Sequence, residues 1–143
     1  MNLYMLDTDM ASYLIRGDVP SVTKAFARHY PNICISVITY AELQYGMMKR
    51  NSRPLTQKVQ AFCNLVRIIP WSAEMAVSYA KLRMELEANG NLIGSMDMLI
   101  AASALAEGAT LVSNNTEHFS RVKGLKLENW MNPHSFTLAK ERP

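Results

Sequence analysis

The sequence predicts an α/β fold built on a central, mainly parallel β-sheet flanked by α-helices. Short apolar runs predict strands over 2–6, 33–36, 66–69, 110–113 and 125–128. Helical periodicity lies between them, over about 8–16, 20–30, 37–49, 55–65, 73–88 and 96–107. This alternation indicates a parallel sheet, because parallel neighbours need a crossover connection that is usually a helix.

Residues at the predicted helix ends support these assignments. Proline is suited to the first turn of a helix, glycine to the position after its end, and serine to the N-cap. The residues in question are Pro20 and Pro54 near helix starts, Gly17 and Gly108 at helix ends, and Ser36, Ser72 and Ser95 as N-caps.

Two of the helices differ in their apolar pattern. The helix over 96–107 is apolar almost all round, which predicts that it is buried in the domain. The helix over 37–49 carries Ile38, Ala41, Tyr45 and Met48 on one face, which predicts an apolar stripe along it.

Length and composition predict one globular domain. The chain has 143 residues, of which 49% are hydrophobic and 19% charged, enough for a core without disulfides. We expect the domain to span 1–130, with 131–143 as a C-terminal tail that loses periodicity. The net charge of +3 is compatible with a nucleic-acid partner but equally with none.

The sequence predicts a reducing, cytoplasmic setting. The N-terminal apolar run is too short for a signal peptide, and no run approaches the roughly 18 apolar residues of a membrane span. Cys34 and Cys63 have no metal-ligand spacing, and Cys34 lies within an apolar run as a buried hydrophobe would.

Three acidic residues stand where core elements begin or end. Asp7 ends an apolar run and opens a helical stretch, Glu42 lies in the second turn of the helix over 37–49, and Asp97 lies in the first turn of the helix over 96–107. Singly, Glu42 is an ordinary solvated helix acid and Asp97 a complement to the helix dipole. Together, at the carboxyl edge where α/β folds bind ligands, they suggest a metal site for phosphoryl chemistry.

Four segments in order carry a family resemblance. They are "YMLDTD", "CISVITYAELQYG", "GSMDMLIAASALAEGATLVSNN" and "FSRVKGLKLENW", which extend from Leu3 to Trp130. In sequence and spacing they resemble the PIN-domain ribonucleases of the VapC toxin family.

The resemblance implies a metal-dependent endoribonuclease, the toxin of a type II toxin–antitoxin pair. It implies Mg²⁺ or Mn²⁺ as cofactor, RNA as substrate with tRNA as a candidate, inhibition by a cognate VapB-type antitoxin, and a homodimer. The family's metal-binding and catalytic acids fall on Asp7, Glu42 and Asp97. Its small polar residue after the first acid falls on Thr8, and the polar cluster after the fourth strand falls on Ser113, Asn114 and Asn115.

The sequence departs from the family pattern at two places. Asp9 stands where many relatives have asparagine, as an extra acid near the site or a first-turn acid that complements the helix dipole. His118 stands where a further carboxylate is expected. Glu117 then replaces that carboxylate by a register shift, or a second metal position is weakened, or His118 contacts substrate phosphate, or it faces water.

Two other functions are compatible with parts of the sequence. Asp7-Thr8-Asp9 after an apolar strand resembles the nucleophile motif of HAD-type phosphatases, although "TLVSNN" lacks their late acidic pair. A catalytically inactive PIN-like binding module is the second alternative. The basic residues Lys49, Arg50, Arg53 and Lys58 line an RNA path or belong to a solvated surface.

Overall fold

The computed structural model describes residues 2–131 and confirms the α/β prediction. Its five strands form one sheet in the order β3-β2-β1-β4-β5, and every neighbouring pair is parallel. The strands are β1 (Tyr4–Leu6), β2 (Ile33–Ser36), β3 (Arg67–Ile69), β4 (Thr110–Val112) and β5 (Lys126–Glu128). The helices are α1 (Thr8–Arg16), α2 (Pro20–His29), α3 (Val37–Arg50), α4 (Arg53–Leu65), α5 (Ala73–Ala88), α6 (Ser95–Glu107) and α7 (Thr116–Phe119).

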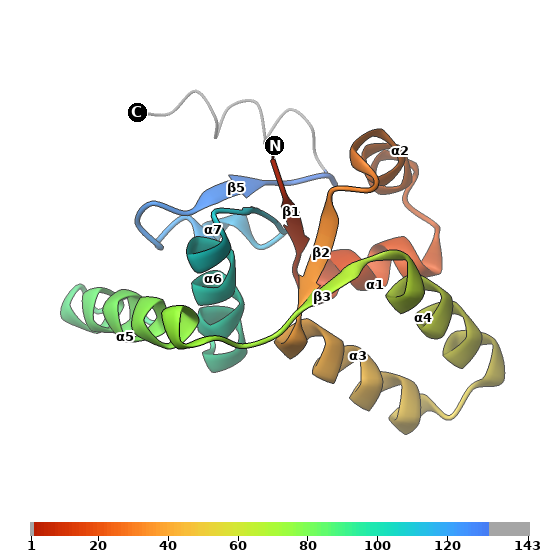
Figure 1. Ribbon diagram of the computed structural model, residues 1–143, viewed down its shortest axis with the longest axis horizontal. Helices are drawn as coiled ribbons and strands as arrows, with labels where there is room; N and C mark the ends of the chain where they lie inside the picture. The colour runs from red at the N-terminus through yellow and green to blue at the C-terminus, as the bar shows by residue number, and fades with distance from the viewer. Residues whose placement is uncertain (1, 132–143) are drawn as a thin grey trace.

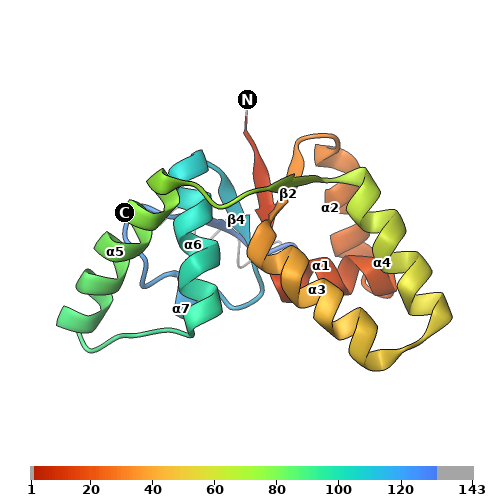
Figure 2. The ribbon, with the colours of Figure 1, turned by 60° about the horizontal axis from the view of Figure 1, so that its bottom comes forward.

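The helices form a layer on either side of the sheet, α1 to α4 on one side and α5 to α7 on the other (Figures 1 and 2). Two hydrophobic cores result, because successive strand residues point to opposite faces. Tyr4 and Leu6 of β1 pack in the core beneath α1 to α4, whereas Met5 between them packs in the core beneath α5 and α6. Both faces of the central strands are therefore buried, as expected of a parallel sheet.

Three neighbouring strands each end in a residue that caps the next helix. Asp7 follows β1, Ser36 ends β2 and Ser72 follows β3. Each side chain accepts a hydrogen bond from the backbone N–H three residues on. This pattern brings the starts of α1 and α3 to the carboxyl edge of the sheet, next to β4.

Two details of the helix predictions were wrong. Ser95 is the first residue of α6 and does not cap it; Gly94 is the cap residue and makes no side-chain cap hydrogen bond. The stripe predicted on α3 is also not its buried face, because Thr39, Leu43 and Met47 turn inward. Tyr45 and Met48 are 65% and 69% exposed.

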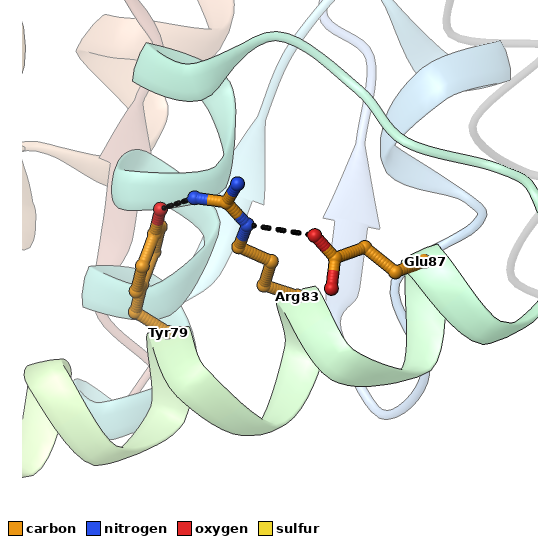
Figure 3. Close-up of polar contacts among 3 residues, drawn as sticks. All are labelled: Tyr79, Arg83 and Glu87. Atoms are coloured by element: carbon orange, nitrogen blue, oxygen red, sulfur yellow. Dashed lines mark hydrogen bonds and ion pairs between the residues drawn. The ribbon is translucent and has the colours of Figure 1, made fainter.

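Helix α5 is apolar on more than one side. Met75, Leu82 and Leu86 are buried, mainly against α6. A polar row runs along another side, where Arg83 donates to the Tyr79 hydroxyl (2.7 Å) and to Glu87 (3.2 Å) (Figure 3). Such exposed pairs stabilise a helix by only about 0.3–0.5 kcal/mol. Val77 and Met84 remain exposed despite their apolar side chains.

The structure adds one helix to the predicted elements near the C-terminal end of the described residues. The short helix α7 was not predicted, because four residues are too few to show helical periodicity. Most of the predicted tail, 132–143, lies outside the described residues, and Met131 packs against the core under α1 to α4. Within residues 2–131 no helix combines the length and apolar character needed to cross a membrane.

Candidate metal centre

Asp7 is a buried carboxylate held in a defined orientation. It lies at the end of the central strand, where its backbone N–H donates to the Val112 carbonyl (3.0 Å). Its Oδ1 accepts from the Met10 N–H (2.8 Å) and its Oδ2 accepts from the Ser113 hydroxyl (2.6 Å). The residue is only 4% exposed.

Burial makes the ionised form of Asp7 costly. The pKa of Asp7 is raised from 3.8 to about 6, chiefly by burial; the hydrogen bonds from Ser113 and Met10 oppose this shift, and the charges of Asp9 and Asp97 add to it. A cation at this point would offset both the burial cost and the repulsion.

Asp97 and Glu42 add to the negative charge of the site around Asp7. The pKa of Asp97, which is half-buried in the first turn of α6, is raised by burial and then by the charges of Glu42 and Asp9, while His118 lowers it. Asp97 is therefore close enough to both Asp7 and Glu42 for their charges to repel. Asp9 also contributes charge to the site from an exposed position.

Glu42 is oriented by the start of α1. The Thr8 hydroxyl lies 2.5 Å from Glu42 Oε1 and 3.2 Å from the Thr39 hydroxyl. Because a hydroxyl has one proton, the carboxylate receives it and the Thr39 hydroxyl can donate to Thr8. Thr39 was missed in the sequence; the available signal was its position one turn before Glu42 on the same helix.

The polar cluster after β4 divides into two roles. Ser113 is fully buried; it donates to Asp7 and accepts from the Asn115 backbone N–H (2.8 Å). The Asn115 side chain then contacts His118 Nδ1 (2.9 Å). Asn114 instead turns away and accepts from the side chain of buried Asn129 (3.1 Å), a contact that the sequence did not predict.

The donor set fits a hard divalent cation that keeps part of its water shell. Within residues 2–131 no three His, Cys, Asp or Glu side chains form a ready-made coordination group. Mg²⁺ does not require one, because it typically binds through one or two carboxylates plus waters and substrate phosphate oxygens. Carboxylate oxygens are also the ligands that suit Mg²⁺ and Mn²⁺.

Comparison with known proteins identifies the family. The sequence model of the PIN domain matches residues 4–125. The chain is 43% identical to Ribonuclease VapC2 of Rickettsia felis over 90% of this chain and 98% of that protein. It is 33% identical to the tRNA(fMet)-specific endonuclease VapC of Shigella flexneri, over 89% of this chain and 97% of the relative.

Solved structures agree with the sequence matches. The crystal structure of VapBC2 from Rickettsia felis, bound to a DNA fragment from its promoter, superposes with a TM-score of 0.84 at 41% identity and covers 90% of this chain and 98% of that one. DNA-bound VapBC from Salmonella typhimurium gives a TM-score of 0.83 at 29% identity, over 91% and 99%.

The fold is that of a PIN domain. The chain belongs to the PIN-domain family and, within it, to the VapC ribonucleases. The alternative of a HAD-type phosphatase is thereby set aside, since the match spans the Asp7-Thr8-Asp9 segment together with both other acids.

Proposed function

We propose that the protein is a Mg²⁺- or Mn²⁺-dependent endoribonuclease and the toxin of a toxin–antitoxin pair. The observation that carries this proposal is Asp7, a buried carboxylate whose pKa is raised to about 6 among other acids at the carboxyl edge of the sheet. A structural carboxylate at that depth would normally have a cationic partner; here the neighbouring charges are negative.

The site residues have separable tasks in this reaction. Asp7 and Asp97 would hold the ion, and a divalent ion bound there would supply activation of a water and charge to offset that growing on the phosphate. Ser113 and the start of α1 fix the two Asp7 oxygens. Thr8 directs one oxygen of Glu42, leaving the other to orient water or a second ion. The products would carry a 5′-phosphate and a 3′-hydroxyl.

A structured tRNA is the substrate class we propose. Support comes from the name of the Shigella flexneri relative, a tRNA(fMet)-specific endonuclease that aligns with nearly the whole chain. The exposed cations at the junction of α3 and α4 offer phosphate contacts; these are Lys49, Arg50, Arg53 and Lys58.

Metal addition tests the function. Purified protein, freed of metal with EDTA, is incubated with a tRNA(fMet) transcript. We expect no cleavage until Mg²⁺ or Mn²⁺ is added, and then fragments with the end groups given above. Cleavage that persists in EDTA would contradict metal dependence. Binding of the tRNA without cleavage under any metal condition would instead indicate an inactive binding module.

We further propose a VapB-type antitoxin as partner, with one of its segments in a groove beside the acids. The groove has a volume of about 270 Å³ and lies between α1, α3 and α4. Its walls are aliphatic, formed by Ile15, Leu43, Met47, Leu55 and Val59.

The ends of the groove differ in charge. Thr8 and Glu42 line one end, and Arg16 and Arg50, each the last residue of its helix, line the other. An amphipathic peptide fits this pattern better than RNA does, because bases usually stack on aromatic rings. The peptide would present a basic side chain, plausibly arginine, toward Asp7 or Asp97 and acidic ones toward the arginines.

Gly46 allows this contact to be tested without damaging the fold. A Cβ at Gly46 would meet nothing within 4 Å, and the residue lines the groove. We expect Gly46→Leu to fold at least as stably as wild type, because leucine is favoured in helices by roughly 0.5–1 kcal/mol over glycine. It should lose binding to the product of the adjoining small open reading frame by about 10-fold or more.

The control is Gln60→Leu, an equally apolar change at an exposed position of α4 outside the groove. Binding is measured by sedimentation of the mixed proteins. Equal binding by both variants would contradict the groove as the antitoxin site, and loss of tRNA binding by Gly46→Leu alone would assign the groove to RNA.

The same sedimentation runs test the homodimer, which we also propose. Large apolar side chains are exposed on α3, α5 and α6, among other elements, a surplus that an interface between copies would cover. On these three helices they are Tyr45 and Met48 on α3, Val77 and Met84 on α5, and Met96 on α6. A monomer at micromolar concentration would contradict the dimer.

A further inference from the structure

His118 is connected to Asp7 through a row of hydrogen bonds. Its ring lies half-buried in α7, with Nδ1 2.9 Å from Asn115 Nδ2. Asn115 in turn donates its backbone N–H to the Ser113 hydroxyl, which donates to Asp7 Oδ2. The imidazole is therefore not a freely rotating surface side chain. Asn115, which contacts it, is hydrogen-bonded to Ser113, and Ser113 is hydrogen-bonded to the buried carboxylate of Asp7.

The contact with Asn115 determines which ring nitrogen carries the proton. The Asn115 amide nitrogen is a donor only, so His118 Nδ1 must present its lone pair. In the neutral ring the proton then resides on Nε2. A protonated Nε2 has no lone pair for a metal ion, but it donates a hydrogen bond to an anion.

The position of the ring places this donor near the candidate metal centre. The hydrogen bonds through Asn115 and Ser113 hold the ring close to Asp7, and His118, when charged, also lowers the pKa of Asp97. The charges of Glu42 and Asp9 act on the same carboxylate and raise its pKa. A phosphate group bound at these acids would thus lie near the ring of His118, on the side of the site formed by α6 and α7.

We propose that His118 binds a phosphate oxygen of the RNA backbone through its Nε2–H, and that Asn115 is the positioning residue that holds the ring in this tautomer. This inference rests on the proposed ribonuclease function, which it deepens by assigning a substrate contact. It selects one of the alternatives left open by the sequence and sets aside metal ligation by His118.

Three substitutions separate a phosphate contact from a metal ligand. His118→Gln retains an N–H donor near the position of Nε2, whereas His118→Glu offers only acceptor oxygens. Asn115→Asp accepts a hydrogen bond, so in the neutral ring it draws the imidazole proton to Nδ1 and leaves Nε2 as an acceptor. Glu117→Gln, on the exposed side of the same helix, is the control.

The measurement is tRNA(fMet) binding in EDTA, which does not depend on cleavage. We expect His118→Gln and Glu117→Gln to bind like wild type, and His118→Glu and Asn115→Asp to bind about 10-fold more weakly, as for a lost hydrogen bond to a charged group. Nitrogen-15 NMR of the imidazole should show the Nε2–H tautomer in wild type and the Nδ1–H tautomer in Asn115→Asp. Thermal unfolding checks that every variant is folded.

Several results would overturn the proposal. A wild-type ring in the Nδ1–H tautomer would contradict the assigned donor, as would equal metal-free binding by all variants or no binding by wild type. A lower Mn²⁺ affinity of His118→Gln, measured by electron paramagnetic resonance, would make His118 a metal ligand. Failure of the proposed function would give a different result: wild-type protein would bind tRNA but would not cleave it after metal addition.

Discussion

Asp7→Asn is expected to stabilise the metal-free protein by up to about 3 kcal/mol near neutral pH, because it removes a charge whose pKa is raised from 3.8 to about 6. The folded pKa is the higher one, so the stability associated with protonated Asp7 is fully present below about pH 4 and is lost as the pH rises through about 6. Asparagine has the same size and can still accept from the Met10 N–H, although the Ser113 hydroxyl must rearrange.

Urea unfolding in EDTA at several pH values measures this effect. The gap between variant and wild type should open between about pH 4 and 7, and Mn²⁺ should narrow or reverse it by stabilising wild type alone. Asp18→Asn, an exposed acid near Arg16, is the control and should change stability by less than about 0.5 kcal/mol at every pH. A variant that is less stable than wild type at neutral pH would show that Asp7 has a stabilising partner that was not identified.

RNA cleavage should respond in the opposite direction. We expect Asp7→Asn and Asp97→Asn each to reduce metal-dependent cleavage by at least about 100-fold, the usual scale for removing one group that stabilises transition-state charge. Glu42→Gln should cost less, since Thr8 can still donate to the amide oxygen and position the side chain.

Initial rates of tRNA cleavage over a range of Mg²⁺ and Mn²⁺ concentrations test these expected losses of activity. A variant that has lost only metal affinity should regain part of its cleavage rate at high Mn²⁺. A variant that has failed to fold should not. Asp9→Asn is an informative comparison, because Asp9 is exposed yet contributes charge to the site. Rates near wild type for Asp97→Asn would refute its assignment as a metal residue, and unchanged rates for Glu42→Gln would make Glu42 an ordinary helix acid.

Much of the fold follows from local patterns in the sequence. The strand predicted over 33–36 and the helices predicted over 8–16 and 73–88 keep the same bounds in the structure, and the other predicted elements shift by one or two residues at their ends. Ser36 and Ser72 cap their helices as predicted, because capping depends on residues only three positions apart. Asp7 could be selected because it ends an apolar run, whereas Glu42 and Asp97 gained meaning only beside Asp7 and through the family resemblance.

The faces of the helices were not determined locally. On α3 the sequence offers two apolar stripes, and only packing against α1 and α4 decided that Leu43 and Met47 turn inward while Tyr45 and Met48 stay exposed. At the start of α6 the cap residue is Gly94 and not Ser95, although serine is the residue type that favours an N-cap.

The sequence alone determined the class of fold and the family, and it proposed the acids of the candidate site, because these depend on periodicity and on residue types at fixed positions. Only the tertiary structure decided how the site is supported. Ser113 reaches Asp7 across 106 residues of chain, and Thr8 reaches Glu42 across 34. Such contacts depend on strand order, which places β4 beside β1, and no local pattern in the sequence records that neighbourhood.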